Sequence, residues 1–66
     1  MNIVEVKERY EPELLKIQGV VGVSADLERN ELVVFVRDRK VCEKIAKLGL
    51  PVKVRCEVVG LITTGG

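Results

Sequence analysis

Histidine and tryptophan are absent from this 66-residue sequence, and phenylalanine and tyrosine occur once each. Without histidine the chain has no imidazole to act as a general base or metal ligand, and no Ser-His or Cys-His pair. Ser24 lies in an apolar segment with no general base near it in the sequence. We therefore expect no enzyme, no cofactor and no small-molecule substrate.

Long apolar runs and nucleotide-binding motifs are also missing. No apolar run approaches the roughly 18 residues that a membrane span needs. The amino-terminal segment carries acids where a signal peptide would have an uninterrupted apolar stretch. Gly19 and Gly22 fit neither the dinucleotide-binding pattern nor the P-loop pattern. These absences predict a cytoplasmic protein without a membrane partner.

The composition is that of a small folded domain. Apolar residues make up 47% of the chain and charged residues 32%, which is too hydrophobic for a disordered protein. A chain this short has a marginal core, so association, a metal or a disulfide often supplements it. We expect one domain over residues 1–60 and a tail over 61–66. Abundant Glu, Lys and Arg with few amides resembles the composition of thermophile proteins.

Apolar residues near the amino terminus recur every three or four positions, as on one face of a helix. Asn2 suits an N-cap and Gly19 a helix stop. Pro12 interrupts the pattern, so residues 2–8 are either the start of a kinked helix, which we favour, or a strand. The apolar positions are Ile3, Val6, Tyr10, Leu14 and Ile17.

The rest of the chain predicts a hairpin, a helix and a strand. Residues 20–26 and 31–37 are rich in β-branched side chains and flank a short polar segment, as in a β-hairpin. Residues 38–48 have helical periodicity between an aspartate N-cap and Gly49. Residues 52–58 alternate between apolar and charged side chains, as in a half-buried strand. The predicted fold is α+β, in the order α-β-β-α-β.

A right-handed crossover through the second helix makes the second and third strands parallel. Placing the first strand between them predicts a three-stranded, mainly antiparallel sheet of order 2-1-3, with both helices on one face. Strand residues expected to face the helices are Val23, Ala25, Leu32, Val34, Val36, Val52, Val54, Cys56 and Val58.

The second predicted strand is apolar from residue 32 to residue 36 without alternation, which indicates burial on both faces. Because two helices cover only one face, Val33, Phe35 and Arg37 form a candidate interface on the open face. A second copy of the chain is the simplest cover, so we expect a homodimer or larger oligomer. The competing interpretation is a monomer whose amino-terminal segment folds over this face.

Charge is distributed unevenly along the chain. Residues 37–55 hold seven bases and two acids, whereas residues 1–36 hold four bases and seven acids. A basic sheet face of Arg37, Lys53 and Arg55 around Phe35 is the alternative functional surface, with weak nucleic-acid binding as its role. RNA-binding sheets normally stack bases on two or more aromatics, so we do not expect nucleic acid to be the main partner.

Cys42 and Cys56 stand fourteen positions apart, on the second predicted helix and the third predicted strand. No Cys-x-x-Cys motif is present, and two cysteines do not complete a zinc site. Three interpretations stay open: two buried thiols, a disulfide between them, or metal binding shared by two subunits.

Two stretches carry family resemblances. Residues 14–20 (LLKIQGV) and 23–27 (VSADL) resemble the passage from first helix to second strand in the heavy-metal-associated domain. That resemblance covers residues 14–59 and implies a ferredoxin-like fragment. The family's loop with two cysteines has no counterpart, so no metal function is implied.

Residues 6–11 (VKERYE) and 14–23 (LLKIQGVVGV) look like the small module found ahead of some bacterial trypsin-like peptidase domains. Residues 33–36 (VVFV) and 49–54 (GLPVKV) are similar to its later strands. The peptidase itself is absent, so this resemblance implies an accessory module. The sequence thus predicts a non-catalytic protein-interaction or self-assembly module.

Overall fold

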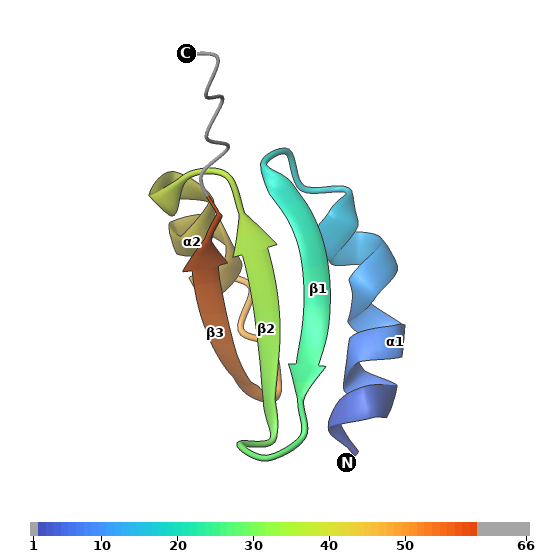
Figure 1. Cartoon of the computed structure of the whole chain (residues 1–66). Coiled ribbons are helices and arrows are strands. Elements are labelled where there is room, and N and C mark those ends of the chain that lie inside the picture. The colour runs from blue at the N-terminus through green and yellow to red at the C-terminus, as the bar shows by residue number, and fades with distance from the viewer. Residues whose placement is uncertain (1, 60–66) are drawn as a thin grey trace.

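The order of helices and strands agrees with the sequence prediction (Figure 1). The computed structural model describes residues 2–59. The predicted tail, residues 61–66, lies outside this range. The elements are α1 (Ile3–Leu15), β1 (Val20–Asp26), β2 (Glu31–Val36), α2 (Arg39–Ala46) and β3 (Lys53–Val58). Neither helix of this described part has the length and apolar character that a membrane span requires.

Helix α1 begins at the predicted cap. The Asn2 side chain accepts a hydrogen bond from the Val4 N–H at 2.9 Å, which satisfies one of the free donors of the first turn. The helix continues through Pro12 to Leu15, so the alternative of a strand over residues 2–8 is excluded. Pro12 is exposed, so the helix loses one backbone hydrogen bond there without burying the gap.

The sheet has the strand order β1-β2-β3, with β1 antiparallel and β3 parallel to β2. The predicted parallel relation of the second and third strands is therefore confirmed. The predicted order 2-1-3 is wrong, and so is the mainly antiparallel pairing, because the sheet is mixed.

Strand β2 is central because its apolar run needs cover on both of its edges and both of its faces. Leu32, Val33, Val34 and Val36 are all buried. Strand β1 contains small and polar side chains instead, which suit an edge. The apolar run without alternation therefore reflects the central position of β2 in the sheet. The sequence prediction attributed it to an uncovered face instead.

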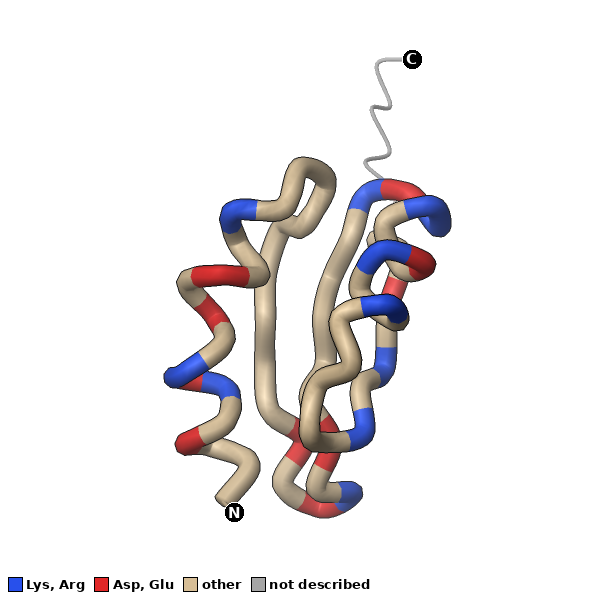
Figure 2. Tube along the Cα trace, turned by 180° about the vertical axis from the view of Figure 1, so that it is seen from behind, with Lys and Arg blue, Asp and Glu red and all other residues tan. Residues whose placement is uncertain are grey.

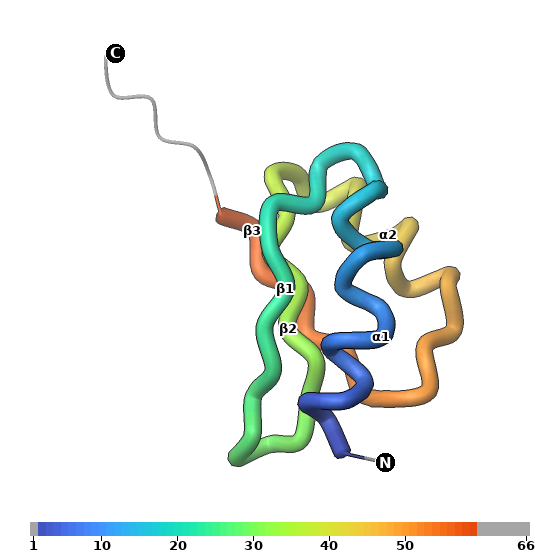
Figure 3. Tube along the Cα trace, turned by 90° about the vertical axis from the view of Figure 1, so that its right-hand side faces the viewer, coloured from blue at the N-terminus to red at the C-terminus, as the bar shows by residue number. Residues whose placement is uncertain are grey.

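Both helices pack on the same face of the sheet, as predicted (Figure 3). The core lies between the two layers, where Leu32, Val34 and Val36 of β2 are fully covered. The buried core residues are Ile3, Val6, Leu14, Leu32, Val34, Val36, Val41 and Ile45. Of the strand residues expected to face the helices, Val58 is largely exposed.

Gly19 lies where the chain leaves α1 and passes close to α2. Its φ of +99° falls where other residues rarely go. A Cβ placed there would lie 2.5 Å from Cγ2 of Val41, the first buried residue of α2. The Gly19 carbonyl accepts a hydrogen bond from the Arg37 N–H at 2.8 Å. Glycine here allows α2 to pack against the α1–β1 connection.

The β1–β2 hairpin is fixed by its own turn. Oδ1 of Asp26 accepts hydrogen bonds from the N–H groups of Glu28 and Arg29, each at 3.1 Å. Asn30 completes the turn with a φ of +55°, which asparagine tolerates better than most residues. Asp26 thereby lies opposite Glu31 in the register.

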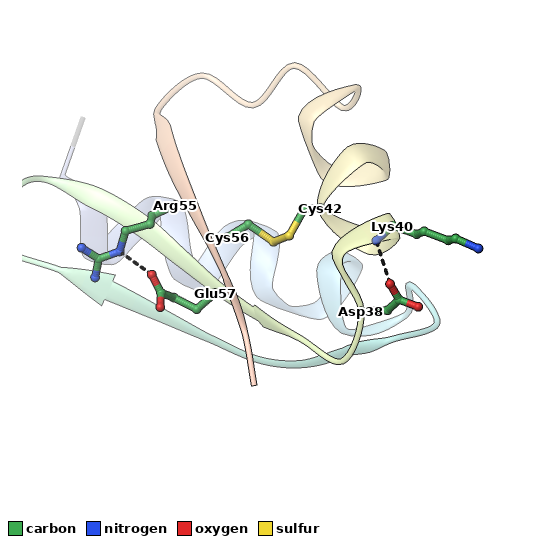
Figure 4. Close-up of a disulfide and its surroundings, with 6 residues drawn as sticks. All are labelled: Asp38, Lys40, Cys42, Arg55, Cys56 and Glu57. Atoms are coloured by element: carbon green, nitrogen blue, oxygen red, sulfur yellow. Dashed lines mark hydrogen bonds and ion pairs between the residues drawn. A yellow bond between two sulfur atoms is a disulfide. The ribbon is translucent and has the colours of Figure 1, made fainter. Parts of the chain in front are cut away.

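Cys42 and Cys56 form a disulfide, which settles the three interpretations left open by the sequence. Their Cα atoms lie 5.8 Å apart, and both side chains are half-buried. The bond joins α2 to β3 on the helix side of the sheet (Figure 4). It therefore fastens the shorter helix to an edge strand.

Candidate interaction surface

The face of the sheet away from the helices is built from alternate residues of the three strands. On β2 these are Glu31, Val33 and Phe35, since Leu32 and Val34 point into the core. Their register partners on β1 are Asp26, Ser24 and Gly22, and those on β3 are Lys53, Arg55 and Glu57. No element of residues 2–59 lies over this face (Figure 3). The alternative in which the amino-terminal segment covers it is wrong, because α1 lies in the opposite layer.

Arg55 reaches across the open face from one edge strand to the other. Its Nη2 lies 3.6 Å from Oδ2 of Asp26 on β1, and its Nη1 lies 3.8 Å from Oε1 of Glu31 on β2. Its Nε lies 3.4 Å from Oε2 of Glu57 on β3 (Figure 4). A side chain that starts on β3 and ends beside β1 must cross β2. Arg55 therefore connects all three strands.

Val33 lies next to Arg55 on the same face of the sheet. It is the register neighbour of Arg55 and only 4% exposed. The aliphatic stem of an arginine covers apolar surface well while its guanidinium stays in water. Val33, which the sequence placed in an exposed interface, is thus on the predicted face but already covered within its own chain.

The Arg55 ion pairs hold this side chain in place across the sheet more than they stabilise the fold. The side chains of Arg55, Asp26 and Glu31 are 38%, 21% and 16% exposed, so these pairs are partly buried, and their N···O distances of 3.4 Å to 3.8 Å are longer than those of good hydrogen bonds. Three carboxylates surround one guanidinium, so the cluster has a surplus of negative charge. This surplus makes Arg55 a poor ligand for phosphate.

Phe35 remains the accessible apolar group of the open face. It is half-buried and lies over Gly22, where a Cβ would be 3.6 Å from Cδ2 of its ring. An aromatic ring over a strand glycine fills the space that the missing side chain leaves. A shallow depression borders the ring and is lined by Ser24, Ala25, Asp26, Leu27, Glu28, Val33, Arg55 and Glu57.

The predicted basic face of Arg37, Lys53 and Arg55 is not formed. Lys53 is the register partner of Glu31 at the start of β2. Arg37 follows the other end of that strand, roughly 20 Å away by strand rise. Arg55 lies between them but is surrounded by carboxylates. Arg37 follows Phe35 by two residues, beyond the end of β2, and does not line the depression beside the ring.

The basic residues gather at α2 instead, as Figure 2 shows. Lys40, Lys44 and Lys47 are exposed and follow one another at intervals of four and three, so they lie along one side of the helix. No ion pair within residues 2–59 involves any of the three. The helical spacing of these lysines is visible in the sequence, but the predicted basic face was composed of Arg37, Lys53 and Arg55 instead.

A second depression lies in the helix layer. It is an apolar groove between α1 and the connection that follows α2, and its volume is about 250 Å³. Its lining residues are Tyr10, Glu13, Leu14, Ile17, Leu48 and Leu50. The groove carries one charged side chain, Glu13, and one phenol, Tyr10, among aliphatic residues.

Within residues 2–59 no group of three Cys, Asp or Glu side chains is arranged to hold a metal ion. Comparison with protein-family models, with curated proteins and with solved structures finds no match to this chain. The resemblances to the heavy-metal-associated domain and to the peptidase-associated module therefore stay predictions. The site must be interpreted from its own geometry.

Proposed function

We propose that this chain is a small non-catalytic protein-interaction or self-assembly module whose contact surface is the open face of the sheet around Phe35. The observation that carries the proposal is a half-buried phenylalanine on a sheet face that no element of residues 2–59 covers. Aromatic side chains are enriched among the residues that dominate binding energy at interfaces. The role as an accessory module, suggested by resemblance, is consistent with this surface.

Self-association is the form of the proposal that can be tested without knowing a partner. The original reason for a dimer, an uncovered Val33, no longer holds, because Arg55 covers that residue. Phe35 alone supports the contact now. The acidic group beside it, its register partner Glu57, would favour a partner surface that combines an apolar group with a basic one.

The test compares Phe35→Glu with Val4→Glu by sedimentation equilibrium. Val4 is an exposed apolar residue in the first turn of α1, where a carboxylate is well tolerated. We expect Phe35→Glu to raise the dissociation constant at least roughly tenfold, and Val4→Glu to leave it unchanged. Wild-type protein that stays monomeric at millimolar concentration would contradict self-association. Equal effects of the two variants would show that the open face is not the contact surface.

The second candidate function is binding of a polyanion such as single-stranded nucleic acid. The lysine stripe on α2 is a better surface for this function than Arg37, Lys53 and Arg55, the basic face predicted from the sequence. The charge reversal variant Lys44→Glu should abolish such binding, while Lys53→Glu on the sheet should not. Affinity that falls steeply with salt would support phosphate contacts, because binding then releases counterions. No binding at low salt would end this alternative.

A further inference from the structure

The two edges of the sheet are protected to different degrees. An edge strand exposes backbone N–H and C=O groups that can pair with another strand, and charged side chains are a common defence against this. Edge strand β3 carries Lys53, Arg55 and Glu57, whereas β1 has no lysine, arginine, glutamate or proline. Strand β1 is therefore the less protected edge.

The outer edge of β1 is also open to approach. Figure 3 looks onto this edge, and no segment of the chain crosses in front of β1. Helix α1 lies behind the plane of the sheet, and in the face-on view of Figure 1 it extends past the outer edge of β1, so a second strand would approach from the side of the open face. Gly22 has no side chain and the side chains of Ser24 and Ala25 are small, so little side-chain bulk stands at this edge.

One feature does limit pairing along β1. The register with β2 shifts between Val20 and Gly22, which makes Val21 the extra residue of a bulge and leaves it 44% exposed. Bulges twist an edge away from regular pairing. The regular part that remains runs over residues 22–26.

We propose that residues 22–26 of β1 pair with the same residues of a second copy, antiparallel across a two-fold axis. Charge favours this arrangement over a parallel stack, because Asp26 is the single charged residue of β1. A two-fold axis near Ser24 places the two Asp26 side chains at opposite ends of the contact, whereas parallel in-register strands would place them side by side. An antiparallel pair also closes after two copies, as two-fold contacts do.

The consequence is a six-stranded sheet with the order β3-β2-β1-β1-β2-β3. A two-fold axis perpendicular to the sheet keeps all four helices on one side and both Phe35 side chains on the other. The two open faces then form one continuous surface with two equivalent contact points. This pairing adds a second surface to the proposed self-assembly and is independent of the open face.

Amide hydrogen exchange of the wild-type protein, measured at low and at high protein concentration, tests the pairing directly. We expect exchange of the outward-facing amides in residues 22–26 to slow roughly fivefold when the total protein concentration is about ten times the dissociation constant, because about one fifth of the chains are then monomeric. The amides of residues 53–58, on the opposite edge, serve as the internal control and should not change. Equal exchange of residues 22–26 at both concentrations would overturn the inference.

Cross-linking supplies a second readout with a matched control. Ser24→Cys places a thiol near the axis, and Val58→Cys places one at an equally open position on the other edge. With diamide as oxidant, we expect a covalent dimer through the introduced thiols for Ser24→Cys and much less for Val58→Cys; equal yields would contradict the pairing.

Measurement of Phe35→Glu alongside separates the two proposals. Association that survives this substitution, with protection of residues 22–26, supports the edge contact and removes the open face. Association of the wild-type protein without that protection, lost in Phe35→Glu, contradicts the edge contact and supports the open face.

Discussion

The packing of α2 against the α1–β1 connection predicts a large effect of the substitution Gly19→Ala. The φ of +99° costs an alanine about 1–3 kcal/mol. The added Cβ would lie 2.5 Å from Cγ2 of Val41, and overpacking of this kind costs about 1–3 kcal/mol more. We therefore expect Gly19→Ala to lower the free energy of unfolding by about 2–6 kcal/mol.

Gly49→Ala is the matched control, because Gly49 also has a positive φ, of +64°, but no atom lies within 4 Å of its added Cβ. It should cost about 1 kcal/mol. Urea unfolding followed by circular dichroism measures both values. In the Val41→Ala background, which lacks Cγ2, the cost of Gly19→Ala should fall to the backbone part alone. The reasoning is refuted if the two glycine variants cost the same, or if the cost of Gly19→Ala is independent of Val41.

Three further predictions concern the disulfide, the open face and the cap of α2. Reduction of Cys42–Cys56 should lower the free energy of unfolding by about 3 kcal/mol, because the bond closes a loop of about 15 residues in the unfolded chain. Thermal unfolding with and without reductant checks this, and an unchanged melting temperature would contradict it. Val33→Ala should cost nearly as much as Val34→Ala, about 2 kcal/mol, since both side chains are buried; a negligible cost at Val33 in urea unfolding would show that Arg55 does not cover it. Asp38→Ala should cost about 1 kcal/mol in the same assay, because Oδ1 of Asp38 accepts from the Lys40 N–H at 3.0 Å, and no loss would mean that this cap is idle.

Local features of the chain were predictable because their causes are local. Asn2 and Asp38 cap the two helices by hydrogen bonds to residues two positions on, and a sequence shows such pairs directly. The alternation in β3 and the short polar turn before β2 likewise depend on neighbours in the chain. Pro12 was the ambiguous residue, and α1 tolerates it because it is exposed.

The strand order was not predictable in the same way, because it depends on contacts between distant segments. The apolar run in β2 fits either a central strand or a strand with an uncovered face. What decides between them is the cover that β1 and β3 supply at its edges and that Arg55 supplies over Val33. An arginine fifty-five residues into the chain gives no sequence signal that it will cross a particular valine.

Only part of the candidate site could be predicted, because the rest depends on contacts between distant strands. Phe35 was placed on the open face by strand alternation alone, and the structure puts it there. Arg37 was grouped with it by alternation and Arg55 by sign of charge; Arg37 follows the end of β2 and does not line the depression beside Phe35, and carboxylates surround Arg55. Grouping of charges requires the register, which the sequence does not contain.

Sedimentation equilibrium of the wild-type protein over a wide concentration range tests the central proposal most directly. The proposed self-assembly predicts that the weight-average mass rises with concentration from the chain mass of 7.3 kDa toward at least twice that value. A mass that stays at 7.3 kDa up to millimolar concentration would contradict self-assembly through either surface of the sheet.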